Sequence, residues 1–220
     1  MKKEKDILIL GGGGHARVLI STLRALQLNI IGILEVDENL VGKSVGGIPV
    51  IGTEDVIEKY SPDDVELVNG VGSVASLLAR KQVFDRFKSK GYKFFTVIHP
   101  SAIIADDVII GEGVQIMAGT VIQTGCQIGD NSIVNTGSVI DHDCFIDSHV
   151  HIAPGAVLSG EVHVGTMTHV GTSSAIIQGI KVGANCLIGA GSVVINDIPA
   201  NSKAIGVPAK VTSKEITYHG

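Results

Sequence analysis

A six-residue period runs without interruption through the second half of the sequence. Sixteen positions spaced six apart, from Ile104 to Val194, all carry Ile, Val or Leu. Because roughly half of the residues in an average protein are apolar, a series of this length is far outside chance. The position two residues before each of these carries Ala, Val, Thr, Cys, Ser or Ile. We therefore expect each repeat to bury one aliphatic and one small side chain.

Six-residue repeats are typical of parallel β-helices, in which each repeat gives a short strand and a corner. Three repeats make one triangular coil of 18 residues, and coils stack about 4.8 Å apart because their strands pair as in a parallel sheet. The period predicts a solenoid of about five coils over residues 100–198. Six repeats have glycine after the aliphatic position, where we expect corners whose backbone angles favour glycine. These are Gly111, Gly129, Gly165, Gly171, Gly183 and Gly189.

The composition of this segment limits its partners. Residues 101–195 contain eight acidic residues and one basic residue, and the whole chain has a net charge of -5. This balance argues against a nucleic-acid surface. No apolar run reaches the roughly 20 residues that span a bilayer, and no signal peptide is recognisable. We expect a cytoplasmic protein with no membrane partner.

The three cysteines point to packing. Cys126, Cys144 and Cys186 all occupy the small position of the repeat, and none forms a CxxC pair. We expect them to be buried, without a metal or a disulfide.

Residues 1–99 predict a Rossmann-like βαβ domain. We expect strands at 6–10, 30–36, 65–71 and 93–98, and helices at 16–27 and 74–90. After the first strand, Gly11, Gly13 and Ala16 match the G-x-G-x-x-G/A pattern of dinucleotide-binding folds. A nicotinamide oxidoreductase is one interpretation, but fewer than 100 residues precede the solenoid, about half of such a fold. Because a glycine turn at a helix start presents free backbone N–H groups, we expect a phosphate site.

Two segments of the solenoid, Ile128–Ser132 and Val182–Cys186, resemble the hexapeptide-repeat acyltransferases. The segment Ile205–Lys210 is similar to the end of that family's domain, and we assign residues 199–220 to a closing segment. The resemblance implies a left-handed β-helix, against the usual right-handed crossover, and a homotrimer. The predicted fold class is therefore an α/β Rossmann-like domain followed by a left-handed parallel β-helix.

The run Asn135–Cys144 resembles the sugar-nucleotide N-acetyltransferases of the bacillosamine and perosamine type. This resemblance implies that His142 is the general base and that Asp143, which is Glu in many members, raises its basicity. The segment Asn39–Val50 looks longer than in some relatives, so the identity of the sugar stays open. The residues that the resemblance assigns to the nucleotide-sugar are Gly13, Gly14, His15, Glu35, Asp37 and Gly72.

Acetyl-coenzyme A is the co-substrate that the resemblance implies, and it assigns four contacts: His151, Gly160, Thr172 and Ala190. Gly160 follows His142 by one coil, so we expect the two to stack and the glycine N–H to stabilise an oxyanion. Thr172 and Ala190 have a different phase around the coil. Both sets can line one site only between two neighbouring solenoids, which agrees with a trimer that has active sites between its subunits.

The remaining candidates are lysines near the end of the solenoid and three further histidines. The coenzyme A phosphates need positive charge, which the solenoid lacks. The candidates near its end are Lys203, Lys210 and Lys214. We expect His149, His163 and His169 to be solvated surface residues.

Direct transfer of acetyl to the 4-amino group of a nucleotide-linked amino-deoxysugar, for surface glycan synthesis, is the function that these residues favour. His142 would remove a proton as the amine attacks the thioester. Acetylation of a hydroxyl group of sialic acid or a related sugar is the alternative, because those transferases share this architecture. A non-catalytic assembly module, with the glycine loop as a nucleotide sensor, is a third hypothesis.

Overall fold

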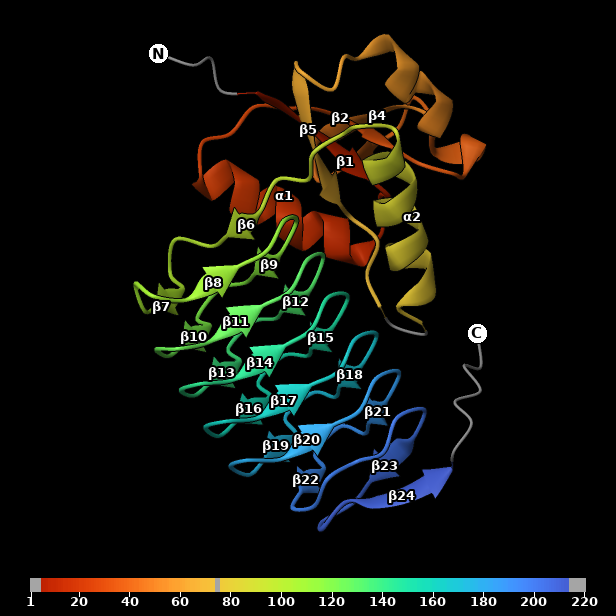
Figure 1. Cartoon of the computed structure of the whole chain (residues 1–220). Coiled ribbons are helices and arrows are strands. Elements are labelled where there is room, and N and C mark those ends of the chain that lie inside the picture. The colour runs from red at the N-terminus through yellow and green to blue at the C-terminus, as the bar shows by residue number, and fades with distance from the viewer. Residues whose placement is uncertain (1–4, 74–75, 214–220) are drawn as a thin grey trace.

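The computed structural model describes residues 5–73 and 76–213 of the chain. An α/β domain stands at the start of a long stack of short strands (Figure 1). Residues 74 and 75 of the predicted second helix, and the candidate Lys214, lie outside the described residues. Neither helix of the described part is long and apolar enough to cross a membrane.

The N-terminal domain is a five-stranded sheet with one helix on each side. In chain order its elements are β1 (Asp6–Leu10), α1 (Gly14–Ala25), β2 (Ile30–Leu34), the short helix η1 (Glu38–Leu40), β3 (Ser44–Val45), β4 (Ile48–Gly52), the short helix η2 (Glu54–Lys59), β5 (Val65–Asn69) and α2 (Leu78–Ser89). The strand order is β3-β4-β2-β1-β5, parallel except for the β3–β4 hairpin.

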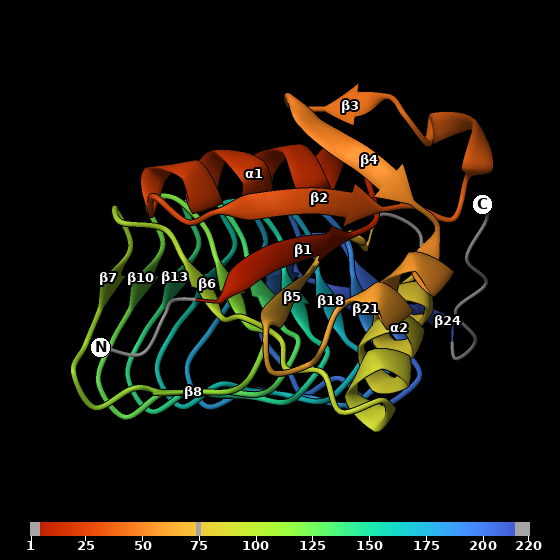
Figure 2. The same ribbon diagram turned by 90° about the horizontal axis from the view of Figure 1, so that it is seen from above.

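Alternation along β1 determines where the helices lie. Ile7 and Ile9 pack in the apolar cluster that contains α1, and Leu8 and Leu10 pack in the cluster that contains α2. Because successive strand residues point to opposite faces, the two helices cover opposite sides of the sheet, as Figure 2 shows from above.

Two details differ from the predicted elements. The β3–β4 hairpin adds two strands to the edge of the sheet that the sequence periodicity does not predict. It begins within the segment Asn39–Val50, which looks longer than in some relatives, and ends at Gly52. The predicted last strand, 93–98, is divided between two sheets. Phe94 makes a single bridge to Leu67 of the N-terminal sheet, whereas β6 (Val97–Ile98) pairs with the solenoid. Val97 belongs to the first coil because it is buried beside Met117, against the cluster that contains α1.

The solenoid is a triangular stack with three faces, each formed mainly by parallel strands. The first face contains β7 (Ile103–Ile104), β10 (Val121–Ile122), β13 (Val139–Ile140), β16 (Val157–Leu158), β19 (Ala175–Ile176) and β22 (Val193–Val194). The second contains β8 (Ile109–Ile110), β11 (Gln127–Ile128), β14 (Phe145–Ile146), β17 (His163–Val164) and β20 (Lys181–Val182). The third contains β6, β9 (Gln115–Ile116), β12 (Ile133–Val134), β15 (His151–Ile152), β18 (His169–Val170), β21 (Leu187–Ile188), β23 (Lys203–Ile205) and β24 (Lys210–Ser213).

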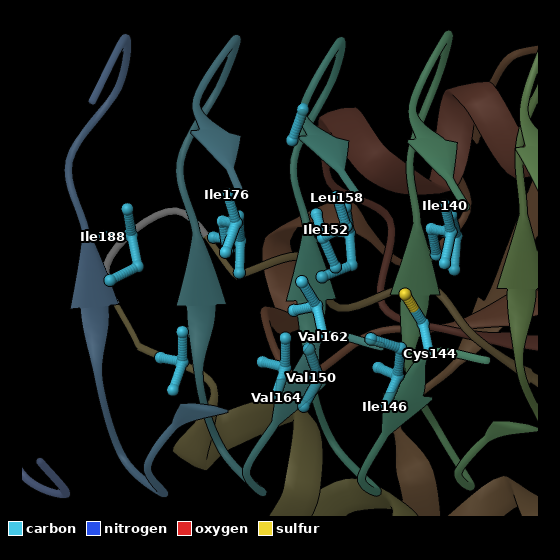
Figure 3. Packing of buried hydrophobic residues seen from close by; sticks show 14 of the residues in the cluster. Ile140, Cys144, Ile146, Val150, Ile152, Leu158, Val162, Val164, Ile176 and Ile188 are labelled. Atoms are coloured by element: carbon cyan, nitrogen blue, oxygen red, sulfur yellow. The ribbon is translucent and has the colours of Figure 1, made fainter. Parts of the chain in front are cut away.

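The predicted repeat is confirmed strand by strand. Each aliphatic position of the period is the second residue of a strand from β7 to β22, and it pairs with the equivalent residue of the next coil, as Ile122 does with Ile140. Figure 3 shows these side chains filling the interior, and all three cysteines are buried there as expected. The stack is the left-handed parallel β-helix implied by the resemblance, and β24 closes its end by antiparallel pairing with β23.

The explanation given above for the corner glycines is wrong. None of the six has a positive φ. A Cβ built on Gly129 or on Gly165 would lie 2.5 Å from the backbone nitrogen of Ser148 or of Ala184 in the next coil. These glycines therefore allow close stacking of coils. The left-handed backbone falls two residues later, for example at Asn131 with φ 57°.

The N-terminal domain is fixed to the third face by a buried polar junction. Arg80 of α2 is fully buried. Its Nη1 donates to the carbonyl of Asn69 at 2.9 Å, and its Nε donates to the carbonyl of Asn131 at 3.0 Å. Burial lowers the pKa of Arg80 to about 9, so the guanidinium stays charged at neutral pH. This charge holds the end of β5 against a corner of the solenoid.

Candidate active site

The glycine turn opens into a pocket of about 680 Å³, a size that suits a small-molecule ligand. Five of the six predicted nucleotide-sugar residues line it: Gly13, Gly14, His15, Glu35 and Gly72. The sixth, Asp37, does not. Its carboxylate accepts the backbone N–H of Asn39 at 2.9 Å and caps the short helix η1.

The pocket presents backbone N–H groups to a ligand. Helix α1 begins at Gly14, and its first turn contains no acidic residue. The N–H groups of that turn have no partner within the helix and carry the positive end of its dipole. Glu35 holds the loop in place, since its Oε2 accepts the N–H of Gly12 at 2.6 Å. The helix start is therefore available to an anion such as a diphosphate.

His15 has a defined protonation state. The side-chain amide of Gln115 donates to the carbonyl of Asn69 at 2.8 Å, so its oxygen faces His15, whose Nε2 donates to it at 2.7 Å. Burial is the main reason that the pKa of His15 falls to about 4, and the charge of Arg80 lowers it further. The ring is neutral at pH 7. Its Nδ1, which is the remaining acceptor, is left for a donor.

Gln115 is not recognisable as a site residue from the sequence alone. It lies 100 residues from His15 in the chain and occupies the outward position of strand β9 on the third face. Its only signal is a polar residue at a position that turns out to be fully buried.

His151, predicted to contact coenzyme A, lies on the third face under the loop that follows β5. It is 8% exposed. Its Nδ1 hydrogen-bonds to Ser73, and its Nε2 accepts from Asn135 at 3.0 Å. Burial, followed by the neighbouring His169, sets its pKa well below the ordinary value.

Two of the histidines expected on the surface are also partly covered. The ring of His169 lies edge-to-face with His151 at 4.8 Å, and the ring of His149 lies edge-to-face with Phe84 of α2 at 5.6 Å. Burial lowers the pKa of both. The expectation of solvated side chains is wrong for these two, because the N-terminal domain packs over this face. His163, on the second face, remains partly exposed.

His142 and Asp143 form a pair at the edge between the first and second faces. Asp143 Oδ2 accepts from His142 Nδ1 at 2.9 Å. The neighbouring Asp141 accepts the backbone N–H of His142. The hydrogen bond with Asp143 is the main cause that raises the pKa of His142. With Nδ1 engaged, Nε2 carries the lone pair and is the atom that can act as a base.

Gly160 lies directly above this ring, as the 18-residue coil predicted. A Cβ on Gly160 would lie 2.5 Å from His142 Nε2, so only glycine leaves room for the imidazole. Among the described residues, no acceptor is within hydrogen-bond range of the Gly160 N–H. A donor without a partner beside the base can stabilise negative charge that develops on a substrate oxygen.

One chain does not bring all predicted residues together. Thr172 and Ala190 are exposed in successive turns at the edge between the third and first faces. His142 and Gly160 lie at another edge, opposite the third face that carries the glycine-loop domain. Among the described residues, no group of His, Cys, Asp and Glu is arranged to hold a metal ion.

A hexapeptide solenoid with a histidine–aspartate pair on its edge, joined to a small α/β domain with an anion-binding loop, defines the class of hexapeptide-repeat transferases. Residues 6–87 match the PglD N-terminal domain, and residues 107–142 match the bacterial transferase hexapeptide model. The chain belongs to the family of sugar-nucleotide N-acetyltransferases that includes the bacillosamine and perosamine enzymes.

Solved structures of relatives superpose over almost the whole chain. PerB from Caulobacter crescentus, in complex with CoA and GDP-perosamine, is 35% identical with a TM-score of 0.89, covering 96% of this chain and 99% of that one. The acetyltransferase domain of PglB from Neisseria gonorrhoeae, in complex with acetyl coenzyme A, is 36% identical with a TM-score of 0.88, covering 95% and 100%.

A curated relative matches over a shorter span. UDP-N-acetylbacillosamine N-acetyltransferase from Bacillus subtilis is 38% identical over 118 residues. The match spans 52% of this chain and 52% of that protein, about half the length of each.

Proposed function

We propose that this protein transfers acetyl from acetyl-coenzyme A to the 4-amino group of a nucleotide-linked amino-deoxysugar, a step in surface glycan synthesis. The observation that carries the proposal is the His142–Asp143 pair, with Nε2 free beside the unpartnered N–H of Gly160. The relatives whose names mention GDP-perosamine and UDP-N-acetylbacillosamine support an amino-sugar acceptor. The proposal leaves both nucleotides open, GDP as in the first relative's ligand and UDP as in the second relative's name.

The proposed reaction is a direct transfer. The neutral sugar amine attacks the thioester carbonyl as His142 Nε2 removes its proton, and Asp143 stabilises the imidazolium. The Gly160 N–H stabilises the oxyanion of the tetrahedral intermediate. Collapse breaks the carbon–sulfur bond, and the departing thiolate takes the proton from His142. The cysteines take no part, because all three thiols are buried inside the solenoid.

In the proposed complex, the nucleotide-sugar binds in the glycine-loop pocket. Gly13, Gly14 and the start of α1 hold the diphosphate through backbone N–H groups. His15 accepts a hydrogen bond from the ligand through Nδ1. Glu35 and Gly72 shape the walls of the pocket. Asp37 stands outside it, at the start of η1.

The proposed assembly is a homotrimer with each active site between two subunits. The pocket and His142 lie on different sides of one chain, so a neighbouring chain must complete the site. The outward positions of the first face support this assembly, because every one is apolar and at least partly exposed. They are Ile103, Val121, Val139, Val157, Ala175 and Val193.

Coenzyme A is proposed to lie in the cleft between neighbouring solenoids. Gly160 would come from one chain, and Thr172 and Ala190 from the other. His151 would contribute the edge of its ring next to Asn135. Lys203 and Lys210, with Lys214 outside the described residues, would pair with the phosphates. We place the reaction in the cytoplasm.

A panel of nucleotide-activated amino sugars and acetyl-coenzyme A, followed by thiol release, tests the proposal. We expect turnover with a 4-amino sugar and none with the matching hydroxyl sugar. Acetylation of hydroxyl acceptors alone would support the sialic-acid type of reaction instead. Binding of nucleotide-sugars without any acetyl transfer would support the non-catalytic module.

A further inference from the structure

The His142–Asp143 pair at the solenoid edge packs against Gly125, a glycine that the proposed mechanism does not use. Gly125 lies one coil before Asp143, at the same corner position. A Cβ built on Gly125 would collide with Asp143 Oδ1 and would lie 3.2 Å from its Cγ. The carboxylate therefore occupies the space that a side chain at residue 125 would take.

Backbone conformation does not explain this glycine. Gly125 has a φ of 75°, but the same corner of later coils carries Asp143 at 58° and Glu161 at 60°. The chain thus accepts side chains with this left-handed backbone. The requirement for glycine at 125 comes from the carboxylate that folds over it, while Oδ2 of the same carboxylate reaches His142.

The corner that contains Gly125 is itself held by the coil before it. Asp107 Oδ2 accepts the Gly125 N–H at 3.0 Å and the Thr124 hydroxyl at 2.7 Å. These bonds fix the surface on which Asp143 lies. The Asp143 side chain lies over this surface while 63% of it stays exposed.

We propose that Gly125 is a positioning residue for the acetyl transfer, which acts by leaving the space in which Asp143 reaches His142. The inference rests on the proposed function of that pair as the base. The acidic groups that face His142 are Asp141 and Asp143 of its own corner and Glu161 of the next coil. Of these, Asp143 is the one whose atoms lie nearest to a Cβ at residue 125.

The chain offers a matched control in Gly179. It occupies the same corner three coils later with a φ of 74°, and a Cβ there would meet nothing within 4 Å. Gly125→Ala and Gly179→Ala therefore impose the same backbone cost, and only the first displaces Asp143. A third variant, Gly125→Ala combined with Asp143→Ala, restores the space.

The first measurement is the NMR titration of the His142 imidazole in the folded protein without substrate, which does not depend on any activity. We expect the His142 pKa to fall in Gly125→Ala, as it does in Asp143→Ala, and to stay at the parent value in Gly179→Ala. An unchanged His142 pKa in folded Gly125→Ala would overturn the inference even if the protein proved not to be an acetyltransferase.

The second measurement is kcat as a function of pH with an active amino-sugar. We expect Gly125→Ala to lower kcat about tenfold or more and to move the acid limb to lower pH. The double variant should be no slower than Asp143→Ala alone, because both remove the same contact. An equal loss in Gly179→Ala, or a further loss in the double variant, would show a general effect on folding and contradict the positioning role. If Gly125→Ala does not fold, a double variant that folds and titrates like Asp143→Ala supports the collision, and one that also fails to fold overturns it.

Discussion

His142 depends on its neighbours for both its orientation and its basicity. Asp143 engages Nδ1 and raises the pKa of the ring, while Gly160 makes room for the other side of the imidazole. The pair itself can be recognised in the sequence, because both residues are adjacent in one corner. The glycines that accommodate it lie 17 and 18 residues away, counting from His142. They become visible only when the coils are placed on one another.

Replacement of His142 by Ala should abolish most of the acetyl transfer, since general bases contribute about 10²–10⁴-fold to rate. Steady-state kinetics would show the loss in kcat, with little change in the KM for the nucleotide-sugar. His163→Ala, on the second face, provides a control that should keep the parent rate. A His142→Ala enzyme within a few fold of the parent would remove His142 from the mechanism.

The pH profile should follow the raised pKa of His142. Because the base must be neutral, activity is lost as pH falls through that pKa, so the acid limb should lie above about 6.5, the ordinary value for histidine. Asp143→Ala lowers the pKa and should move the limb toward that value, with a lower plateau. A limb that does not move in Asp143→Ala would show that another group controls it.

Replacing Gln115 tests how the solenoid controls His15. Gln115→Glu places a carboxylate at His15 Nε2, which should raise the His15 pKa and charge the ring at neutral pH. Gln115→Met removes the hydrogen bond without adding charge. NMR titration of His15 should distinguish the two, and the KM for the nucleotide-sugar should become pH-dependent only in the Glu variant. Identical titrations in both variants would contradict the assigned hydrogen bond.

The strands of the solenoid are so short that their stability comes from stacking. Each strand from β6 to β22 has two residues, and its neighbours are the equivalent strands one coil away. The period therefore predicts every strand from β7 to β22, while the order of elements in the N-terminal domain is predicted less well. The strand expected at 93–98 was misassigned, because nothing local shows that Val97 leaves one sheet for another. Arg80 and Ser73 were missed for the same reason, since their partners lie across the domain junction.

Because Gly165 packs against the next coil, its replacement by Ala should lower the stability of the fold more than the same replacement at a glycine with open space around it. Gly165→Ala forces its Cβ against the backbone of the next coil, and overpacking of this kind costs about 1–3 kcal/mol or more. Gly137→Ala meets nothing within 4 Å but has a φ of 67°, which costs about 1–2 kcal/mol. Denaturant unfolding should rank Gly165→Ala as the less stable variant. The reverse order would argue against close stacking as the reason for glycine.

At the scale of the whole molecule, the glycine-loop pocket and the base are held apart by the solenoid itself. The buried junction fixes the N-terminal domain on the third face, and His142 lies at the opposite edge. A second chain is therefore part of the proposed active site. The need for a second chain follows from the positions of the site residues around the 18-residue coil, and these positions can be counted from the sequence.

A charge on the first face should dissociate the proposed trimer and, by the same change, abolish acetyl transfer. Val157→Glu places a carboxylate on the apolar first face, whereas Gln127→Glu changes an exposed position of the second face. Sedimentation should show smaller particles only for Val157→Glu, with a parallel loss of acetyl transfer. An active monomer would contradict the shared site.

The coil length also restricts how a chain like this can change its length over evolution. Loss or gain of 18 residues removes or adds one coil and returns every later residue to its own face. A change of six residues would keep the aliphatic core intact but rotate everything beyond it by one face. Such a chain could still fold, yet its two substrate sites would point in directions that no neighbouring copy could match. Insertions and deletions in this solenoid should therefore survive selection in whole coils.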